Sequence, residues 1–211
     1  MKPDNKLQAT NNKQLLLIFT RNPELGKVKT RLASTVGDGV ALDIYKFLLQ
    51  HTKQVTQNLD VDKTVYYSVK VRENDIWDAA VYQKRQQHGD DLGMRMHNAF
   101  RDAFKNGYEK VVVIGSDLYD ISQSDIEMAF KKLTGRDAVI GPALDGGYYL
   151  LGLTKMIPII FKDKAWGTST VLEDTLSDLK DKNYLLLAQR NDVDVYDDIK
   201  DNGTFQKFFK H

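Results

Sequence analysis

The feature that most constrains the fold is an alternation of short apolar runs with amphipathic stretches. Residues 15–20 (LLLIFT) and 111–115 (VVVIG) are apolar at nearly every position, which is typical of strands buried on both faces. Between them, Val40, Ile44 and Leu48 recur at helical spacing. Strands that alternate with helices predict a mostly parallel sheet covered on both sides. We therefore expect an α/β protein.

The same alternation continues to the C-terminus. Further strands are expected at residues 64–69, 138–140, 148–153 and 185–188, and helices at 92–104, 122–133, 170–179 and the end of the chain. Ser122 with Asp125 is an N-cap pattern, and Thr170 with Glu173 has the spacing of a capping box. Ligands of such sheets bind beyond the carboxyl ends of the strands. The residues that follow each strand are therefore the candidates for function.

Composition narrows the class of protein. The chain has 211 residues, a formal net charge of +1 and no cysteine. Its length suits one domain over residues 14–211 after a disordered polar tail at 1–13. The charge balance gives no indication of a nucleic-acid partner, and disulfides and thiolate metal sites are excluded. No apolar run approaches the roughly 18 residues of a membrane span. We expect a cytoplasmic protein, and the oligomeric state stays open.

A cationic loop follows the first apolar run. Arg21, Lys27, Lys29 and Arg31 fall within eleven residues, around Gly26. Neither phosphate-binding pattern, G-x-x-x-x-G-K-[ST] or G-x-G-x-x-G, is present. A loop of this kind can nevertheless hold a pyrophosphate between backbone N–H groups and fixed cations. We predict that these five residues contact phosphates, and the alternative is a solvated basic loop.

Acids follow two other strands. Asp117 comes directly after residues 111–115, where a buried acid needs a partner such as a divalent cation that bridges phosphate oxygens. Asp194 is the favoured second ligand from the acidic segment 192–198, in which Asp197 and Asp198 are typical helix N-terminal acids. The sequence therefore predicts a Mg²⁺ or Mn²⁺ site at Asp117 and Asp194. The alternative for Asp117 is an N-cap or turn acid.

The stretch GPALDGGYYLLGL at residues 141–153 is the most informative motif. Asp145, Gly146, Gly147 and Tyr148 open an apolar run that reads as a buried strand. Two glycines let the backbone turn sharply and come close to a ligand. We predict acceptor contacts for both glycines and Tyr148, and a catalytic role for Asp145. The alternative is a hairpin whose Asp-Gly forms a type I′ turn.

Three further residues precede predicted helices. Asp91 and Arg95 lie in the glycine-containing segment 89–95, and we predict nucleotide or phosphate contacts for them. The alternatives are a helix cap for Asp91 and an ion pair for Arg95. Trp166 stands before the helix at 170–179 and is predicted to stack on an acceptor sugar or on a base, with plain packing as the alternative.

At these positions the chain resembles the DUF2064 family, which is described as radical-SAM/selenodomain-associated transferase 1 or arsenosugar-type glycosyltransferase. The resemblance lies in the motifs at residues 21–32, 87–96, 141–153 and 166–168, and it covers about residues 15 to 200. The family is similar to the GT-A nucleotide-diphospho-sugar transferases and to phospholactate guanylyltransferases. Two segments depart from its pattern: Leu118-Tyr119 stands where the family has a proline after Asp117, and Val195-Tyr196 stands where it has Thr-Pro.

The resemblance implies a GT-A-like, Rossmann-type three-layer sandwich. It implies a metal-dependent glycosyltransferase that uses a nucleotide-sugar donor and a small-molecule acceptor, with Asp117 and Asp194 on Mg²⁺ or Mn²⁺. Lys29 and Arg31 would stabilise developing charge, and Asp145 would orient or deprotonate an acceptor hydroxyl. The alternatives are a nucleotidyltransferase that uses an NTP and a phosphorylated acceptor, and a nucleotide-binding protein without catalysis. A phosphate-ester hydrolase lacks an evident nucleophile.

Overall fold

The computed structural model describes residues 13–209, and these form a seven-stranded sheet with the order β3-β2-β1-β4-β6-β5-β7. The strands are β1 (Gln14–Thr20), β2 (Asp62–Tyr67), β3 (Gln83–Gln86), β4 (Lys110–Gly115), β5 (Ala138–Pro142), β6 (Tyr148–Leu153) and β7 (Tyr184–Leu186). Strand β6 is antiparallel to both of its neighbours, and every other pair of adjacent strands is parallel. The expectation of a mostly parallel sheet is confirmed.

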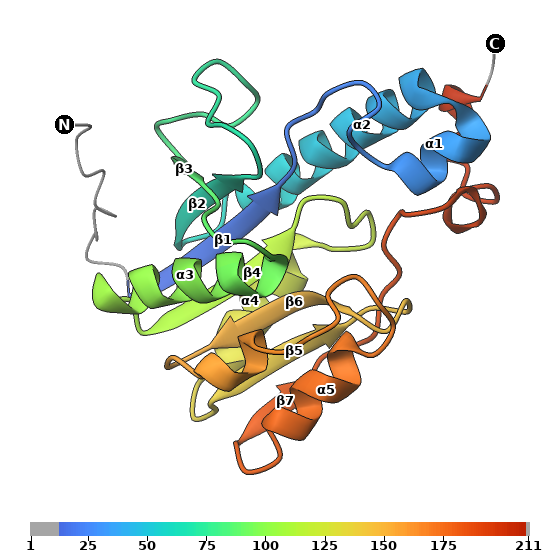
Figure 1. Cartoon of the computed structure of the whole chain (residues 1–211). Helices are drawn as coiled ribbons and strands as arrows, with labels where there is room; N and C mark the ends of the chain where they lie inside the picture. Colours follow the sequence, from blue (N-terminus) through green and yellow to red (C-terminus); the bar gives the residue numbers. More distant parts are fainter. Residues whose placement is uncertain (1–12, 210–211) are drawn as a thin grey trace.

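Helices cover both faces of this sheet (Figure 1). The helical elements are α1 (Thr30–Val36), α2 (Asp38–Thr56), α3 (Leu92–Lys105), α4 (Gln123–Lys132), η1 (Pro158–Phe161), α5 (Val171–Asp178), η2 (Tyr196–Asp198) and η3 (Gln206–Phe208). Helices α2 and α4 pack on one face, and α3, η1 and α5 pack on the other. The three-layer α/β architecture expected from the sequence is therefore confirmed.

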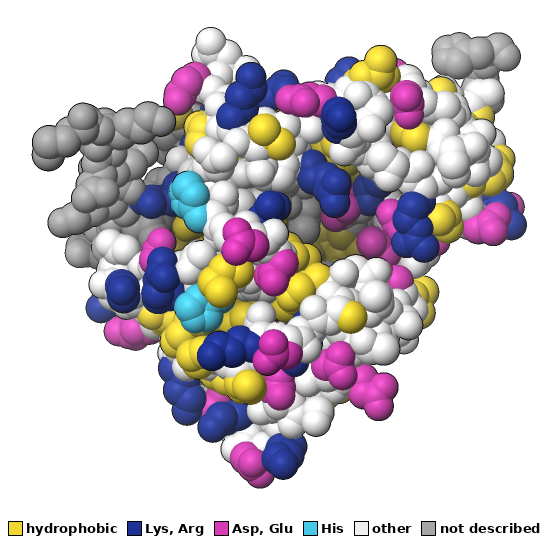
Figure 2. All heavy atoms as spheres, in the orientation of Figure 1, with side chains coloured by type: hydrophobic (Ala, Val, Ile, Leu, Met, Phe, Trp, Pro, Cys, Tyr) yellow, Lys and Arg dark blue, Asp and Glu magenta, His cyan; other side chains and the backbone are white. Residues whose placement is uncertain are grey.

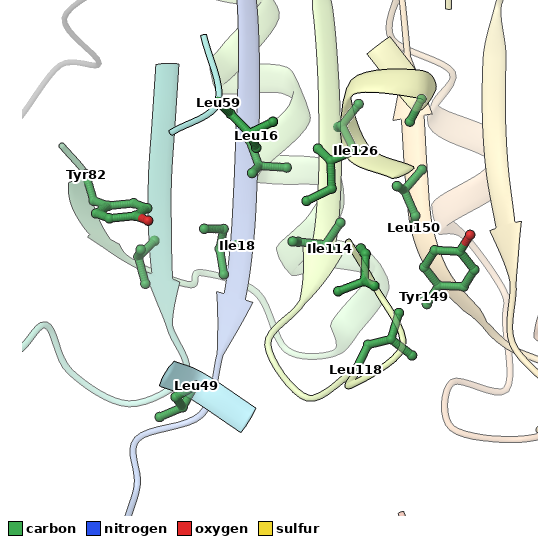
Figure 3. Close-up of a cluster of buried hydrophobic side chains, with 14 of the residues drawn as sticks. Leu16, Ile18, Leu49, Leu59, Tyr82, Ile114, Leu118, Ile126, Tyr149 and Leu150 are labelled. Atoms are coloured by element: carbon green, nitrogen blue, oxygen red, sulfur yellow. The ribbon is translucent and has the colours of Figure 1, made fainter. Parts of the chain in front are cut away.

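The apolar run in β1 contributes side chains to the hydrophobic cores on both faces of the sheet. Leu16 and Ile18 belong to the core between the sheet and helices α2 and α4, whereas Leu15 and Leu17 belong to the core on the α3 side. All four side chains are fully buried. Figure 3 shows the first of these cores, in which Leu16 and Ile18 point the same way as Ile114 of the neighbouring strand. Burial on both faces is why the run is apolar at consecutive positions.

A third apolar cluster holds the C-terminal segment against the first two helices. Leu32 of α1 and Ile44 of α2 pack with Val193 and Phe205, all of them buried. In Figure 1 this segment, in red, runs from β7 past the carboxyl ends of the central strands to α1. The cluster brings the acids that follow residue 191 to the end of the sheet where β1 and β4 finish.

Several local expectations are wrong. The final helix is absent from residues 13–209, where the C-terminal segment forms only the 3-10 turns η2 and η3. Thr170 precedes α5 but makes no capping hydrogen bond, whereas the capping box of Ser122 and Asp125 is confirmed. Helix α1 and strand β3 were not expected, since α1 has only seven residues and β3 is a short polar edge strand.

Two other expectations concern regions rather than elements. The proposed tail at 1–13 lies outside the described residues except for Lys13, whose carbonyl accepts hydrogen bonds from Glu109 and Lys110. Within residues 13–209, no helix is both long enough and apolar enough to cross a membrane.

The strand order of the sheet reverses direction between β1 and β4, which makes this place a topological switch point. From β1 the sheet extends through β2 to β3, and on the other side it extends through β4. Such a switch point leaves a crevice at the carboxyl ends of the two central strands. Phe19 is in register with Gly115, so the loops that follow β1 and β4 leave the sheet side by side.

Candidate functional site

A buried tyrosine joins the two loops at the switch point. Tyr45 of α2 accepts a hydrogen bond from the Arg21 backbone N–H at 2.9 Å. Its hydroxyl also lies 3.2 Å from both the Thr20 and the Ser116 hydroxyls. Burial, followed by the charge of Asp117, raises the pKa of Tyr45, so the hydroxyl stays neutral. This network fixes the first residues after β1 against those after β4.

Asn22 fixes the same loop to the segment that follows β2. Its side-chain amide donates to the Lys70 carbonyl at 2.8 Å and accepts from the Val69 backbone N–H at 3.0 Å. Beyond this anchor the loop is exposed, and Gly26 turns it with a φ of 69°. The side chains of Arg21 and Lys27 therefore reach solvent from a loop whose start is held in place.

Lys29 and Asp117 form an ion pair across the crevice. The Lys29 Nζ lies 2.7 Å from Asp117 Oδ2, and the side chains are 5% and 41% exposed respectively. Burial by itself would lower the pKa of Lys29, but the nearby carboxylates, led by Asp117, outweigh it and raise this pKa. Burial works against the Asp117 carboxylate, but Lys29 and then Arg21 keep its pKa below the usual value. Both groups are therefore charged, and the open side of Asp117 faces a cavity.

Arg31 pairs with Asp194, the second predicted metal ligand. The Arg31 Nη1 lies 2.5 Å from Asp194 Oδ2, in a pair whose arginine side chain is 70% exposed. Asp194 is not among the described residues that line the cavity beside Asp117. The structure thus places Asp194 against the cationic loop, while Asp192 lines the cavity.

The cavity has a volume of about 220 Å³ and is bordered by three carboxylates, Asp117, Asp145 and Asp192. They come from the loops after β4 and β5 and from the C-terminal segment. Backbone hydrogen bonds from Leu144 to the Arg190 carbonyl (3.0 Å) and from Arg190 to the Pro142 carbonyl (3.1 Å) hold the last two loops together. Figure 2 shows this side of the molecule hollowed, with acidic and basic side chains around the depression.

Asp192 is a candidate site residue that the sequence did not predict. Burial, followed by the negative charges of Asp117 and Asp145, raises its pKa to about 6. In the sequence, Asp192 and Asp194 are equivalent acids on either side of Val193. The sequence-based preference for Asp194 did not anticipate this difference, because it depends on where Arg31 and Asp117 lie.

The loop at residues 143–147 joins β5 to β6 as an antiparallel hairpin. A type I′ turn is wrong for it, because Gly146 has a φ of 88° while Asp145 is not among the described residues with positive φ. A Cβ atom on Gly146 would lie only 2.1 Å from the Ser169 carbonyl oxygen. The Gly146 carbonyl also accepts from the Leu172 backbone N–H at 2.9 Å. Gly146 is thus required for packing against the start of α5, and Gly147 lines the cavity.

Asp145 remains available to a ligand within this loop. Its Oδ1 accepts from the Gly147 backbone N–H at 2.8 Å, and its side chain is exposed toward the cavity. No described cation forms an ion pair with it within 4 Å. One carboxylate oxygen therefore holds the loop, while the other is open to the cavity.

Two aromatic side chains form a wall of the cavity. Tyr148 and Trp166 meet edge to face, with ring centroids 6.5 Å apart. Gly93 of α3 lets Trp166 approach, since a Cβ there would lie 2.5 Å from the indole Nε1. Burial raises the pKa of Tyr148, so its hydroxyl stays protonated. Tyr148 and Trp166, two of the four predicted acceptor residues, therefore border one space with Asp145.

Asp91 and Arg95 have structural contacts in this structure. Asp91 caps α3 by accepting from the Met94 backbone N–H at 2.7 Å. Arg95 Nε donates to the Gly89 carbonyl at 3.0 Å. Neither residue is among the described residues that line the cavity. Their contacts with a nucleotide stay predictions.

The carboxylates of the site could hold a hard divalent cation only together with the phosphate groups of a bound substrate. Within residues 13–209, no three His, Cys, Asp or Glu side chains are grouped closely enough to hold a metal ion by themselves. Asp117 and Asp192 do face one cavity, where burial and then the negative charge of Asp117 raise the pKa of Asp192. Mg²⁺ is commonly held by one or two carboxylates together with substrate phosphates and water. The residues present fit that kind of site.

Comparisons with known proteins agree with this architecture. Residues 50–168 match the family described as "Uncharacterized protein conserved in bacteria (DUF2064)". A provisionally assigned nucleotide-diphospho-sugar transferase from Desulfovibrio desulfuricans G20 is 32% identical, with a TM-score of 0.81 and 94% of each chain covered. No functionally curated protein matches the chain.

More distant structures share the fold alone. The inositol-1-phosphate CTP transferase from T. maritima is 13% identical, with a TM-score of 0.57 over 95% of this chain and 96% of that one. The 4-diphosphocytidyl-2C-methyl-D-erythritol synthase from Anaerococcus prevotii is 11% identical, with a TM-score of 0.57 over 92% and 97%. Since the family match spans more than half of the chain and the D. desulfuricans relative nearly all of it, this protein belongs to the DUF2064 family and has the nucleotide-diphospho-sugar transferase fold.

Proposed function

We propose that the protein is a transferase that moves a glycosyl group from a nucleotide-diphosphate sugar to a hydroxyl acceptor. The observation that carries this proposal is the division of charge at the switch point. Lys29 of the cationic loop contacts Asp117, and Asp117 also borders a cavity that contains the carboxylates of Asp145 and Asp192. A donor diphosphate suits the cationic loop, and an acceptor suits the cavity. The assignment of the D. desulfuricans relative supports the same reaction class.

The cationic loop would hold the diphosphate. Arg21 and Arg31 expose their guanidinium groups, which can bind phosphate oxygens in a bidentate manner. Lys27 is exposed on the same loop, and its ammonium group can bind a phosphate as a point charge. Lys29 is held rigidly beside Asp117, so it would stabilise the charge that develops on the leaving diphosphate.

Asp117 would hold Mg²⁺ or Mn²⁺ together with an acid from the C-terminal segment. We favour Asp192 as this second ligand, because it lines the cavity while Asp194 is paired with Arg31. Asp194 would serve only if a phosphate drew Arg31 away from it. The metal, when bound, would neutralise the diphosphate leaving group.

Asp145 would act on the acceptor. Its open carboxylate oxygen would orient the hydroxyl and accept its proton as the oxygen attacks the anomeric carbon. The bond from that carbon to the diphosphate breaks, and the nucleoside diphosphate leaves with its negative charge beside Lys29. The Gly147 N–H holds Asp145 in place for this role.

Nucleotidyl transfer is the second candidate. It is favoured by the shared fold with cytidylyl-transferring enzymes such as the T. maritima protein. In that reaction the same cations would hold a triphosphate, and a phosphorylated acceptor would attack the α-phosphorus and release pyrophosphate. The two reactions differ in their products, a nucleoside diphosphate in one and pyrophosphate in the other.

Loss of catalysis is the third candidate, motivated by the missing prolines at Leu118-Tyr119 and at Val195-Tyr196. In the structure, Tyr119 fills a place in the third apolar cluster, with its ring centroid 5.1 Å from that of Phe205 and 5.8 Å from that of Phe47. The loop therefore has a hydrophobic anchor in place of a proline. This observation supports an intact site.

The test is a thermal-shift panel of nucleotides and nucleotide sugars, with and without Mg²⁺ or Mn²⁺, followed by product analysis of each stabilising donor. A ligand at a hundred times its Kd stabilises the folded state by about 2.7 kcal/mol. We expect a nucleotide sugar to raise the Tm in a metal-dependent manner and to yield a nucleoside diphosphate when an acceptor is present.

The Asp117→Asn variant should lose the metal dependence, and if it did not, the metal assignment would be wrong. The exposed Asp197→Asn variant is the control. Release of pyrophosphate from an NTP would support the second candidate, and binding without any turnover would support the third. No stabilisation by any nucleotide would overturn all three.

A further inference from the structure

The charge of the cavity beside Asp145 bears on which acceptor it can hold. Asp117, Asp145 and Asp192 are its charged members, and no lysine, arginine or histidine is among the described residues that line it. Of the cations nearby, Lys29 is already paired with Asp117 and Arg190 with Asp125, and Arg21 acts on Asp117 from the exposed loop outside the lining of the cavity. A second anion placed in this cavity would face three carboxylates without a cation among the described lining residues.

The remaining surface of the cavity is mainly apolar. Met96 of α3, Val113 of β4 and the rings of Tyr148 and Trp166 contribute to it. Tyr148 makes its hydrogen bond to the Met96 sulfur, at 3.9 Å, and presents no other polar contact there among the described residues. Aromatic edges and aliphatic side chains of this kind bind the C–H face of a sugar or an aromatic ring.

We propose that the acceptor is a hydroxyl compound without a phosphate or carboxylate group, uncharged or cationic, whose apolar face lies against Tyr148 and Trp166. This inference rests on the proposed function, because it takes the cavity as the acceptor site. It also separates the two catalytic candidates, since nucleotidyl transfer to a phosphorylated acceptor requires an anion in this cavity. Like-charge juxtaposition is a recognised means of rejecting the wrong partner.

Trp166 provides a direct probe of binding. The chain has two tryptophans, and the other, Trp77, is buried in the core on the α2 and α4 side of the sheet. Quenching of tryptophan fluorescence can therefore be measured with three compounds that share a phenyl ring: phenyl β-D-glucoside (neutral), 2-amino-1-phenylethanol (cationic) and phenyl phosphate (anionic). A Trp166→Phe variant should lose the response, which assigns the signal to the cavity.

We expect the neutral and cationic compounds to bind at least about tenfold more tightly than phenyl phosphate, a difference that corresponds to about 1.4 kcal/mol. The Asp145→Asn/Asp192→Asn double variant should narrow this preference by binding phenyl phosphate better. Asp197→Asn, whose carboxylate lies outside the cavity, should leave the preference unchanged. Each titration is run with and without Mg²⁺, because a bound cation could offset the carboxylates.

Equal or tighter binding of phenyl phosphate to the unmodified protein, in either condition, would overturn the inference. Absence of a Trp166 response to both the neutral and the cationic compound would overturn it as well. Failure of the proposed function is read separately, because nucleotide binding is measured by thermal shift and depends on the cationic loop. A protein that binds no nucleotide but prefers the uncharged phenyl compound would refute the transferase while leaving the chemistry of the cavity as described.

Discussion

The two loops that flank the site are held in place by different kinds of interaction. The loop at residues 143–147 is fixed by its backbone, through the hydrogen bonds to Arg190 and Leu172 and the close approach of Gly146 to Ser169. The loop at residues 21–29 is fixed by side chains, through Asn22 at its start and Lys29 at its end. Both loops lie at the same end of the sheet (Figure 1).

The way in which each loop is anchored determines which of its side chains can bind a ligand. A loop held by its backbone leaves side chains free, and Asp145 accordingly has an open carboxylate oxygen. A loop held by its side chains commits some of its charges to structure, as Lys29 is committed to Asp117. Substitutions should therefore affect stability through backbone geometry in the first loop and through charge in the second.

The largest expected effect is on the backbone-held loop. Gly146→Ala introduces a Cβ atom 2.1 Å from the Ser169 carbonyl oxygen at a φ of 88°. Left-handed strain and overpacking together should destabilise the protein by about 2–4 kcal/mol in urea unfolding. Gly107→Ala is the matched control, because it has the same φ of 88° with nothing within 4 Å, so it should cost about 1 kcal/mol or less. Equal losses in the two variants would show that packing against Ser169 does not fix the loop.

The next effect is on the side-chain-held loop. Lys29→Met leaves the Asp117 carboxylate without its partner, which costs about 3–5 kcal/mol for a fully buried pair. Because the Asp117 side chain is 41% exposed, we expect a loss of about 1–2 kcal/mol. We also expect transfer to slow by about 10²–10³-fold, as for loss of one charge-stabilising group. Lys27→Met, on the exposed part of the loop, should change stability by less than about 0.5 kcal/mol. A similar stability for both variants would contradict the structural role of Lys29.

A smaller effect should depend on pH and arises at Asp192, in the cavity beside the backbone-held loop. The pKa of Asp192 is raised from 3.8 to about 6, so the folded protein holds this proton more tightly than the unfolded chain. Its contribution to stability is therefore present below about pH 4 and is lost as the pH rises to about 6. Asp192→Asn should match the unmodified protein near pH 4 and exceed it in Tm near pH 7. A Tm difference that does not change across this range would argue against the crowding of carboxylates in the cavity.

The smallest effect concerns the residue that replaces a proline of the family pattern. Tyr119 donates a hydrogen bond to the Thr204 hydroxyl at 3.2 Å while its ring packs with Phe47 and Phe205. Tyr119→Phe keeps the ring and should lose only about 0.5–1 kcal/mol in urea unfolding. If transfer activity fell along with stability, the hydroxyl would have a role beyond anchoring the C-terminal segment.

Local sequence signals predicted much of the fold. Apolar runs located β1 and β4, and Ser122 with Asp125 marked the start of α4. Elements with weak local signals were missed, such as the edge strand β3, which has four polar residues and no fully buried side chain. The prediction of a C-terminal helix was wrong. The apolar residues of that segment are spaced to pack against α1 and α2, and they do not recur at helical spacing throughout it.

The candidate site divides in the same way. The sequence alone determined which residue types follow the strands, and therefore that cations, an Asp-Gly-Gly hairpin and acids would meet at one end of a parallel sheet. Only the tertiary structure decided which acid faces the cavity. Asp192 and Asp194 are chemically identical and two residues apart, so their difference depends on Arg31 and Asp117, which are distant in the chain. Contacts over such separations are fixed by the packing of whole elements, which local patterns do not encode.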